Sequence, residues 1–160
     1  MGRTITLRDN FLKKFLTIHS ENKIEIPSFS QIYFGEELLA ESFNRVEIEN
    51  NISKHSEIIC IELAQQKLKQ KFLTNCTLIT LIEPCLMCSG AIINSRVEKV
   101  IYLLESKKIP GLSSLSLESI YSENHFPEVC FYFSPEAEEI LKSFFKNNIR
   151  DGKNKENNKI

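Results

Sequence analysis

Residues 76–95 of the chain, CTLITLIEPCLMCSGAIINS, decide the fold. Cys76–Ile82 is a short and almost wholly apolar run rich in β-forming residues, which predicts a central strand of a sheet. Pro84 can open a helix, because a proline at the first helical position loses no hydrogen bond, and this helix is expected to end at about Ser95. A strand followed directly by a helix is typical of an α/β layered domain.

Apolar spacing outside this stretch predicts further elements of both kinds. Helices are expected at residues 9–19 with Asp9 as a cap, at 55–68, and from 135 to about 148 with Ser134 as the cap. Strands are expected at 29–34 and 37–43 around Gly35, at 97–104 and at 129–133. Residues 109–127 are expected to be mostly loop, with a short helix near 115–121.

The length of the chain, 160 residues, fits one domain with one core. We expect this domain to occupy residues 1–150, and we expect residues 151–160, rich in Lys and Asn, to form a disordered tail. No apolar run approaches the roughly 18 residues of a membrane span, and residues 1–10 lack the apolar stretch of a secretory signal. The expected compartment is therefore the cytoplasm.

The overall charge does not identify a partner. The chain has 20 Lys and Arg against 21 Asp and Glu, a net charge of -1, and such a balance can hide a local basic patch. Lys67, Lys69 and Lys71 lie in a stretch without acidic residues. They form either a patch for nucleic acid or a solvated helix face.

Two short motifs carry the chemistry, and each opens an expected helix. The first is His55-Ser56-Glu57 and the second is Pro84-Cys85-Leu86-Met87-Cys88. Cysteines three apart lie on one helix face, and the positive end of the helix favours their thiolate forms. With the imidazole of His55 they make three ligands for Zn²⁺, which leaves the fourth tetrahedral position open for water. Glu57 would then be the acid/base beside the metal.

This pairing of motifs is the established signature of zinc-dependent deaminases. The alternative is a structural zinc site, which a fourth protein ligand would close. Cys60 and Cys76 are the nearby candidates, but both are expected to be buried core residues, as is Cys130. The five cysteines are an odd number without secretory context, which argues against a disulfide framework.

Residues 82–97, IEPCLMCSGAIINSRV, resemble the zinc motif of bacterial tRNA-specific adenosine deaminases. A weaker similarity runs from about residue 11 to residue 145. The resemblance implies a three-layer α-β-α cytidine-deaminase-like fold with a central five-stranded mixed sheet. It also implies a homodimer with one Zn²⁺ per subunit, packed through the small residues Ser89, Gly90 and Ala91. The implied reaction converts adenosine to inosine at the wobble position of a tRNA anticodon.

The same resemblance implies roles for residues outside the metal centre. Asn44 would hydrogen-bond the flipped base, and the alternative role for Asn44 is that of a turn residue. Ser56 and Pro84 would lie beside the substrate near the exchanging amino group. The remaining predicted RNA contacts are Asn124, His125, Phe144 and Phe145.

Some positions depart from the family pattern. Ser56 replaces the usual alanine, residues 103–106 lack the usual Gly-Ala and Asp, and the last helix has fewer arginines than usual. These departures touch the RNA-binding surface and not the zinc chemistry. They leave two alternatives to a tRNA deaminase: a deaminase of a free base or nucleoside of guanine or cytosine type, and a non-catalytic, zinc-stabilised binding module.

Overall fold

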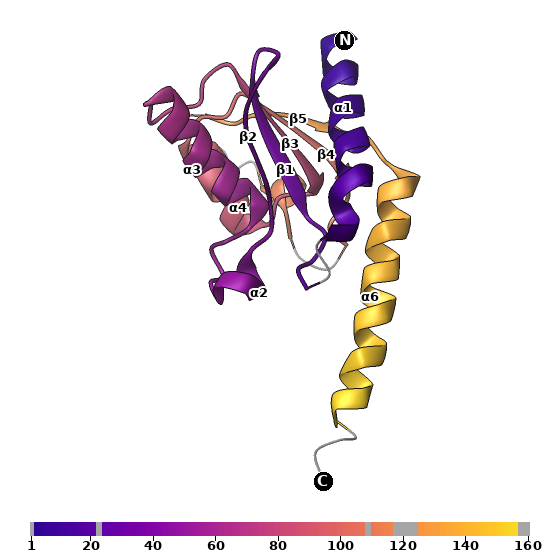
Figure 1. The fold of residues 1–160 in the computed structure, drawn as a ribbon. Helices are drawn as coiled ribbons and strands as arrows, with labels where there is room; N and C mark the ends of the chain where they lie inside the picture. Colours follow the sequence, from indigo (N-terminus) through magenta and orange to yellow (C-terminus); the bar gives the residue numbers. More distant parts are fainter. Residues whose placement is uncertain (1, 22–23, 108–109, 117–124, 157–160) are drawn as a thin grey trace.

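The computed structural model describes residues 2–21, 24–107, 110–116 and 125–156. Figure 1 shows one sheet with helices on both faces, as the three-layer prediction requires. The strands are β1 (Phe29–Phe34), β2 (Glu37–Phe43), β3 (Cys76–Ile82), β4 (Lys99–Leu104) and β5 (Glu128–Phe131). The helices are α1 (Gly2–Ile18), α2 (Val46–Glu49), α3 (Ser56–Leu68), α4 (Leu86–Asn94) and α6 (Pro135–Glu156), with short 3₁₀ turns at His19–Glu21 and Leu112–Ser114.

The five strands form a mixed sheet in the order β2-β1-β3-β4-β5. β1 is antiparallel to both β2 and β3, whereas β3, β4 and β5 are parallel to one another. The β1–β2 turn contains Gly35 with φ 64°, a left-handed conformation that glycine adopts without steric cost. Because β1 is antiparallel to both of them, β2 and β3 point the same way, and their carboxyl ends share one edge of the sheet.

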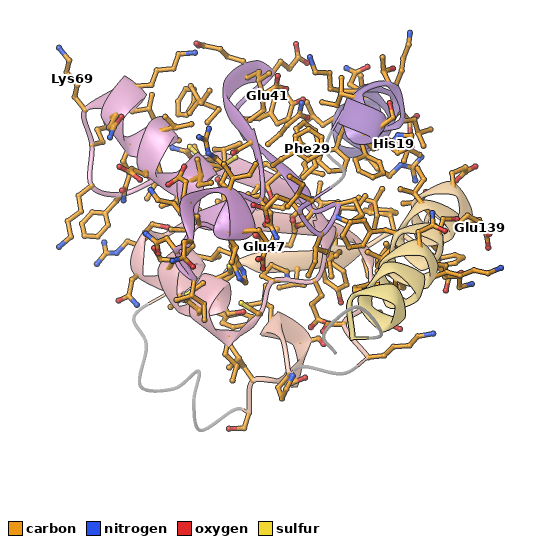
Figure 2. The ribbon with its side chains drawn as sticks, turned by 60° about the horizontal axis from the view of Figure 1, so that its bottom comes forward. His19, Phe29, Glu41, Glu47, Lys69 and Glu139 are labelled. Atoms are coloured by element: carbon orange, nitrogen blue, oxygen red, sulfur yellow. The ribbon has the colours of Figure 1, made fainter. Side chains whose placement is uncertain are left out.

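Two apolar cores hold the layers together. One lies between the sheet and the α3–α4 layer and includes Cys60, Leu78 and Ile92. The other lies under α1 and α6 and includes Phe11, Phe15 and Ile79. Successive residues of β3 point to opposite cores, because side chains alternate along a strand. In Figure 2, Phe29 lies against α1, where its ring stacks on that of Phe11 at a centroid distance of 5.2 Å.

Several helix ends differ from the prediction. α1 begins at Gly2 and not at Asp9, because Leu7 extends the buried stripe of Phe11 and Phe15 by one more turn. Asp9 is thus inside the helix, where its carboxylate pairs with Arg8 at 2.7 Å. α4 begins after Cys85, which is its N-cap, so Pro84 precedes the helix instead of opening it.

The last part of the chain also differs from expectation. α6 continues to Glu156 and so enters the segment that was predicted as a disordered tail. No proline interrupts it after Pro135. The predicted short helix at 115–121 lies mostly outside the described residues. The division into a domain at 1–150 and a tail at 151–160 stays a prediction. Among the described residues, no helix combines the length and apolar character needed to cross a membrane.

Candidate active site

The topology brings the two predicted motifs together at one edge of the sheet. β2 and β3 both end at this edge, and the chain that leaves each strand leads to the start of a helix. His55 is the N-cap of α3, and Cys85 is the N-cap of α4. Neither residue makes a side-chain capping hydrogen bond to its own helix, so both side chains are available for other contacts.

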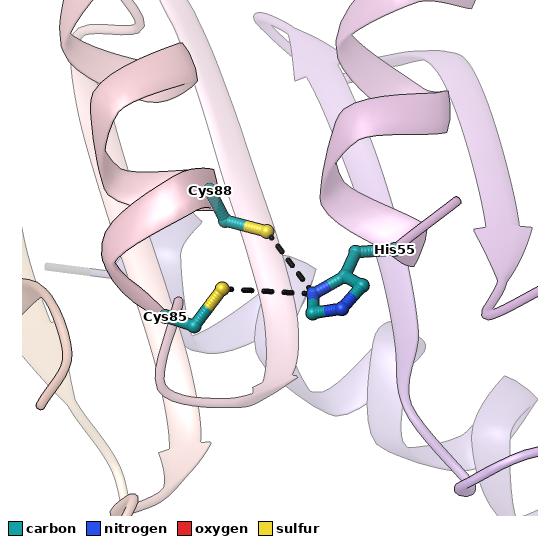
Figure 3. A group of neighbouring side chains, drawn as sticks. All are labelled: His55, Cys85 and Cys88. Atoms are coloured by element: carbon teal, nitrogen blue, oxygen red, sulfur yellow. Dashed lines mark hydrogen bonds between the residues drawn. The ribbon is translucent and has the colours of Figure 1, made fainter. Parts of the chain in front are cut away.

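The ring of His55 faces both cysteine sulfurs (Figure 3). Its Nδ1 atom lies 3.6 Å from Cys85 Sγ and 3.5 Å from Cys88 Sγ. The three potential ligand atoms all lie within 4.8 Å of one another. His55 and Cys85 are partly buried and Cys88 is fully buried. The group therefore lies below the protein surface, between the first residues of α3 and α4.

The protonation states of the group are coupled. Hydrogen bonds from Cys88 and His55 lower the pKa of Cys85 to about 4. The hydrogen bond with Cys85, together with burial, raises the pKa of Cys88. The pKa of His55 is raised, chiefly by its hydrogen bond with Cys85. A thiolate therefore forms first at Cys85, the residue at the electropositive start of α4.

This donor set fits a zinc ion. Zn²⁺ prefers imidazole nitrogen and thiolate sulfur, and catalytic zinc sites commonly have three protein ligands with one open position. Among the described residues, the group that could hold a metal ion consists of His55, Cys85 and Cys88, without a fourth His, Cys, Asp or Glu. Cys60 and Cys76 lie in the core under α3, as expected, and Cys130 is partly buried at β5. This arrangement favours an open site over a closed structural one.

Glu57 lies in the first turn of α3, two residues after His55, and its carboxyl group is close enough to Cys88 to help raise the pKa of that thiol. Its side chain is 4% exposed, and burial raises the pKa of its carboxyl group. The Ser56 hydroxyl donates a hydrogen bond to Glu57 Oε2 at 3.2 Å. A buried carboxyl group with a raised pKa is suited to both accepting and releasing a proton near neutral pH.

Asn44 and Ser56 lie next to this group. Both residues are buried, and a hydrogen bond joins the Asn44 side chain to the Ser56 backbone. Asn44 is 7% exposed, and its Oδ1 accepts a hydrogen bond from the Ser56 backbone N–H at 2.9 Å. Asn44 thereby supplies a cap to α3 that His55 does not provide. The Ser56 side chain is fully buried behind Glu57. The predicted substrate contacts of Asn44 and Ser56 stay predictions. The cap that Asn44 supplies joins residues twelve apart in the chain, so local spacing in the sequence does not reveal it.

Glu83 is a residue of the site region that sequence reasoning did not single out. Its buried carboxylate accepts hydrogen bonds from the Ser113 backbone N–H at 2.8 Å and from the Ser106 N–H at 3.2 Å. Pro84 O accepts a further bond from the Leu112 N–H at 3.0 Å. The segment after β4 is thereby fastened to the loop that carries Cys85. The signal in the sequence that could have identified Glu83 is its position directly before the Pro84-Cys85 pair.

The other predicted contact residues do not converge on the cluster. His125 Nε2 lies 2.7 Å from the carbonyl oxygen of Val97, before β4 begins and hence at the opposite edge of the sheet from Cys85. Phe144 and Phe145 lie on α6, with ring centroids 5.6 Å apart. Asn124 lies outside the described residues. RNA contacts of these four residues therefore remain predictions.

The lysines at the end of α3 also lie away from the cluster. Lys67 forms an ion pair with Glu37 at 3.0 Å, which reduces the positive charge there. In Figure 2, Lys69 extends away from the body of the protein at the end of α3. Because His55 begins α3 and Lys69 follows its end, these lysines and the metal-binding group occupy opposite ends of the helix. Their arrangement agrees with a solvated helix face.

Comparison with known proteins agrees with this geometry. The chain matches the MafB19-like deaminase family over residues 14–148. It is 37% identical over 133 residues to the tRNA-specific adenosine deaminase of Aquifex aeolicus, covering 79% of this chain and 87% of the relative. It is 30% identical over 146 residues to that of Buchnera aphidicola, covering 88% and 95% of the two chains.

Solved structures share the fold at lower identity. A chain from work on A-to-I editing by tRNA:A34 deaminases has a TM-score of 0.69 and 24% identity, over 85% of this chain and 99% of that one. A guanine deaminase from Nitrosomonas europaea has a TM-score of 0.68 and 21% identity, over 85% and 81% of the two chains. The chain therefore belongs to the tRNA-specific adenosine deaminase family, within the superfamily that has the cytidine-deaminase-like fold.

Proposed function

We propose that this protein is a zinc-dependent hydrolase that converts adenosine to inosine at the wobble position of a tRNA anticodon. The observation that carries the proposal is the convergence of His55, Cys85 and Cys88 beside the buried carboxyl group of Glu57. The names of the relatives from Aquifex aeolicus and Buchnera aphidicola support the tRNA substrate. The enzyme and its tRNA would then meet in the cytoplasm.

His55, Cys85 and Cys88 would hold one Zn²⁺ per subunit. When bound, zinc supplies a Lewis acid that makes water nucleophilic near neutral pH. Glu57 would accept one proton from the attacking water and pass it to the purine ring nitrogen, and would then move a second proton from the hydroxyl group added at the ring carbon to the departing amine. Water and adenosine are consumed, and inosine and ammonia are formed.

The substrate is expected to enter as an unstacked base. A nucleotide in a single-stranded loop can be extruded into a pocket at low energetic cost, which suits an anticodon loop. Ser56 and Pro84 are sequence neighbours of the metal ligands, and Asn44 is hydrogen-bonded to the Ser56 backbone. All three residues are proposed to border this pocket. Asn124, His125, Phe144 and Phe145 are proposed to contact the RNA further away.

A homodimer is part of the proposal. Leu86 and Met87, at the start of α4, are 51% and 40% exposed, although both are large apolar side chains. A Cβ added at Gly90 on the same helix would meet no atom within 4 Å. An apolar helix surface of this kind next to the metal ligands is suited to a second copy of the chain. Light scattering of the zinc-loaded protein would give its mass directly.

The direct test is inosine formation in a tRNA with adenosine at the wobble position. Purified zinc-loaded protein should form inosine at that position, and the same tRNA with guanosine there is the control. Folded, zinc-loaded protein that forms no inosine would rule the proposal out. Turnover of a free base or nucleoside, without binding of tRNA, would establish the alternative that the arginine-poor last helix leaves open.

A further inference from the structure

Glu25 is a buried acidic residue that the mechanism above does not use. It lies between the 3₁₀ turn His19–Glu21 and β1, and it is 1% exposed. Burial of a carboxylate is costly unless hydrogen-bond donors hold it. One such donor is the backbone N–H of Ile48, which lies 2.9 Å from Glu25 Oε1. Ile48 belongs to α2, the short helix in the segment that leads from β2 to His55.

Backbone hydrogen bonds connect α2 to the residue directly before His55. Arg45, the N-cap of α2, donates its N–H to the carbonyl oxygen of Lys54 at 2.9 Å. The Lys54 N–H donates to the Asn51 carbonyl oxygen at 3.1 Å, and the Asn51 N–H donates to that of Val46 at 3.0 Å. These bonds make the segment a compact loop. The position of α2 therefore sets the position from which the chain enters His55.

The chain before β1 holds this loop at two points. The Ser28 carbonyl oxygen accepts from the Asn44 N–H at 3.1 Å, and Glu25 accepts from Ile48 as described. Glu25 also lies close enough to His55 for its negative charge to act on the imidazole ring. Residues behind a metal-binding histidine commonly fix the orientation of its ring and tune the affinity for the metal.

We propose that Glu25 is a positioning residue, which fastens α2 through the Ile48 N–H and thereby holds His55 in place for metal binding. This inference rests on the proposed function of His55 as a zinc ligand. Glu25 acts through the backbone of α2 and lies outside the group of potential ligands, which is His55, Cys85 and Cys88 among the described residues. The hydrogen bond, and not the charge of Glu25, carries this role.

The test compares the zinc affinities of Glu25→Gln and Glu25→Met, measured by competition with a chromogenic chelator. Both substitutions remove the charge and keep the length of the side chain, but only Gln keeps an oxygen that accepts from the Ile48 N–H. Glu25→Met should raise the Kd for zinc about ten-fold, whereas Glu25→Gln should stay within about three-fold of wild type. Equal losses in the two variants would overturn the inference.

Glu49→Met is the matched control for this comparison. Glu49 lies on the same helix, but its carboxylate pairs with the side chains of Arg45 at 2.6 Å and Lys54 at 3.7 Å on the surface. Exposed ion pairs of this kind contribute little, so Glu49→Met should bind zinc like wild type. A loss of zinc affinity as large as that of Glu25→Met would show that the bond to Ile48 has no special role.

A second measurement uses wild type and does not depend on the folding of a variant. If the fastening of α2 supports zinc binding, zinc must equally stabilise the fastened state, because coupling is reciprocal. Zinc should therefore slow hydrogen exchange of the Ile48 amide, followed by NMR, more than that of the Glu128 amide, which donates to the Glu98 carbonyl at the opposite edge of the sheet. Exchange of the Ile48 amide that zinc does not slow overturns the inference.

Neither measurement uses the reaction, so failure of the proposed function can be told apart from failure of this inference. Wild type that binds zinc but forms no inosine would refute the proposed reaction, and the two metal-binding measurements would still decide the role of Glu25. Wild type that binds no zinc would overturn both.

Discussion

Gly111 lies directly against the Glu83 carboxyl group. A Cβ at position 111 would lie 2.7 Å from both Cδ and Oε1 of Glu83, closer than side chains approach one another in proteins. The φ angle of Gly111, -122°, is one that any residue adopts, so the glycine is required by close approach and not by backbone strain. This contact joins the segment after β4 to the loop that carries Cys85.

Gly111→Ala should therefore destabilise the protein. The added methyl group must displace a carboxylate that the Ser113 and Ser106 N–H groups hold, at a cost of about 1–3 kcal/mol in the free energy of unfolding. Urea unfolding measures this change. Gly2→Ala is the control, because a Cβ there meets nothing within 4 Å and should be close to neutral. Equal stability of both variants would show that Glu83 yields easily.

Glu57→Gln should separate catalysis from metal binding. The amide has the shape of the carboxyl group but cannot carry the proton, so activity should fall by about 100-fold or more while zinc content stays at the wild-type level. Inosine formation and metal analysis of the same preparation measure the two effects. Glu62→Gln, on the exposed side of the same helix, is the matched control and should be fully active. Substantial activity in Glu57→Gln would show that another group moves the proton.

Removal of the metal should lower the melting temperature. A ligand that binds only the folded state stabilises it in proportion to the logarithm of its concentration over Kd, and a chelator removes this contribution. Cys88→Ala should lose zinc and should no longer respond to the chelator. Cys130→Ala should behave like wild type, because Cys130 lies at β5, outside the group of potential ligands. A chelator-sensitive melting temperature in Cys88→Ala would place the metal elsewhere.

Much of the fold follows from local sequence. The strands Phe29–Phe34, Glu37–Phe43 and Cys76–Ile82 have the predicted bounds, because an apolar run and a flanking turn specify both ends of a strand. Helix ends were less well predicted. Whether α1 starts at Gly2 depends on how far its buried stripe continues, and this depends on the sheet that it covers.

The metal-binding residues could also be predicted, since spacing within each motif and the chain direction of the strands bring them together. The supporting contacts could not. Asn44 caps α3 across twelve residues, and Glu83 meets Ser113 across thirty. Neither pair has a periodic pattern, because each depends on where two loops meet in space. For the same reason, the sequence does not reveal that His125 lies at the edge of the sheet opposite Cys85.

Ser134 gives a quantitative test of the one predicted cap that the structure confirms. Its Oγ accepts a hydrogen bond from the Ala137 N–H at 3.2 Å, and the residue is 4% exposed. Ser134→Ala leaves this N–H without its partner and should cost about 1 kcal/mol in the free energy of unfolding. Ser134→Thr keeps the acceptor for the Ala137 N–H and also the proton that the hydroxyl donates to Glu136 Oε2 at 2.9 Å, so it should retain most of the stability, which urea unfolding of the three proteins would measure. If both variants lose the same amount, the packing of the serine and not its capping bond stabilises α6.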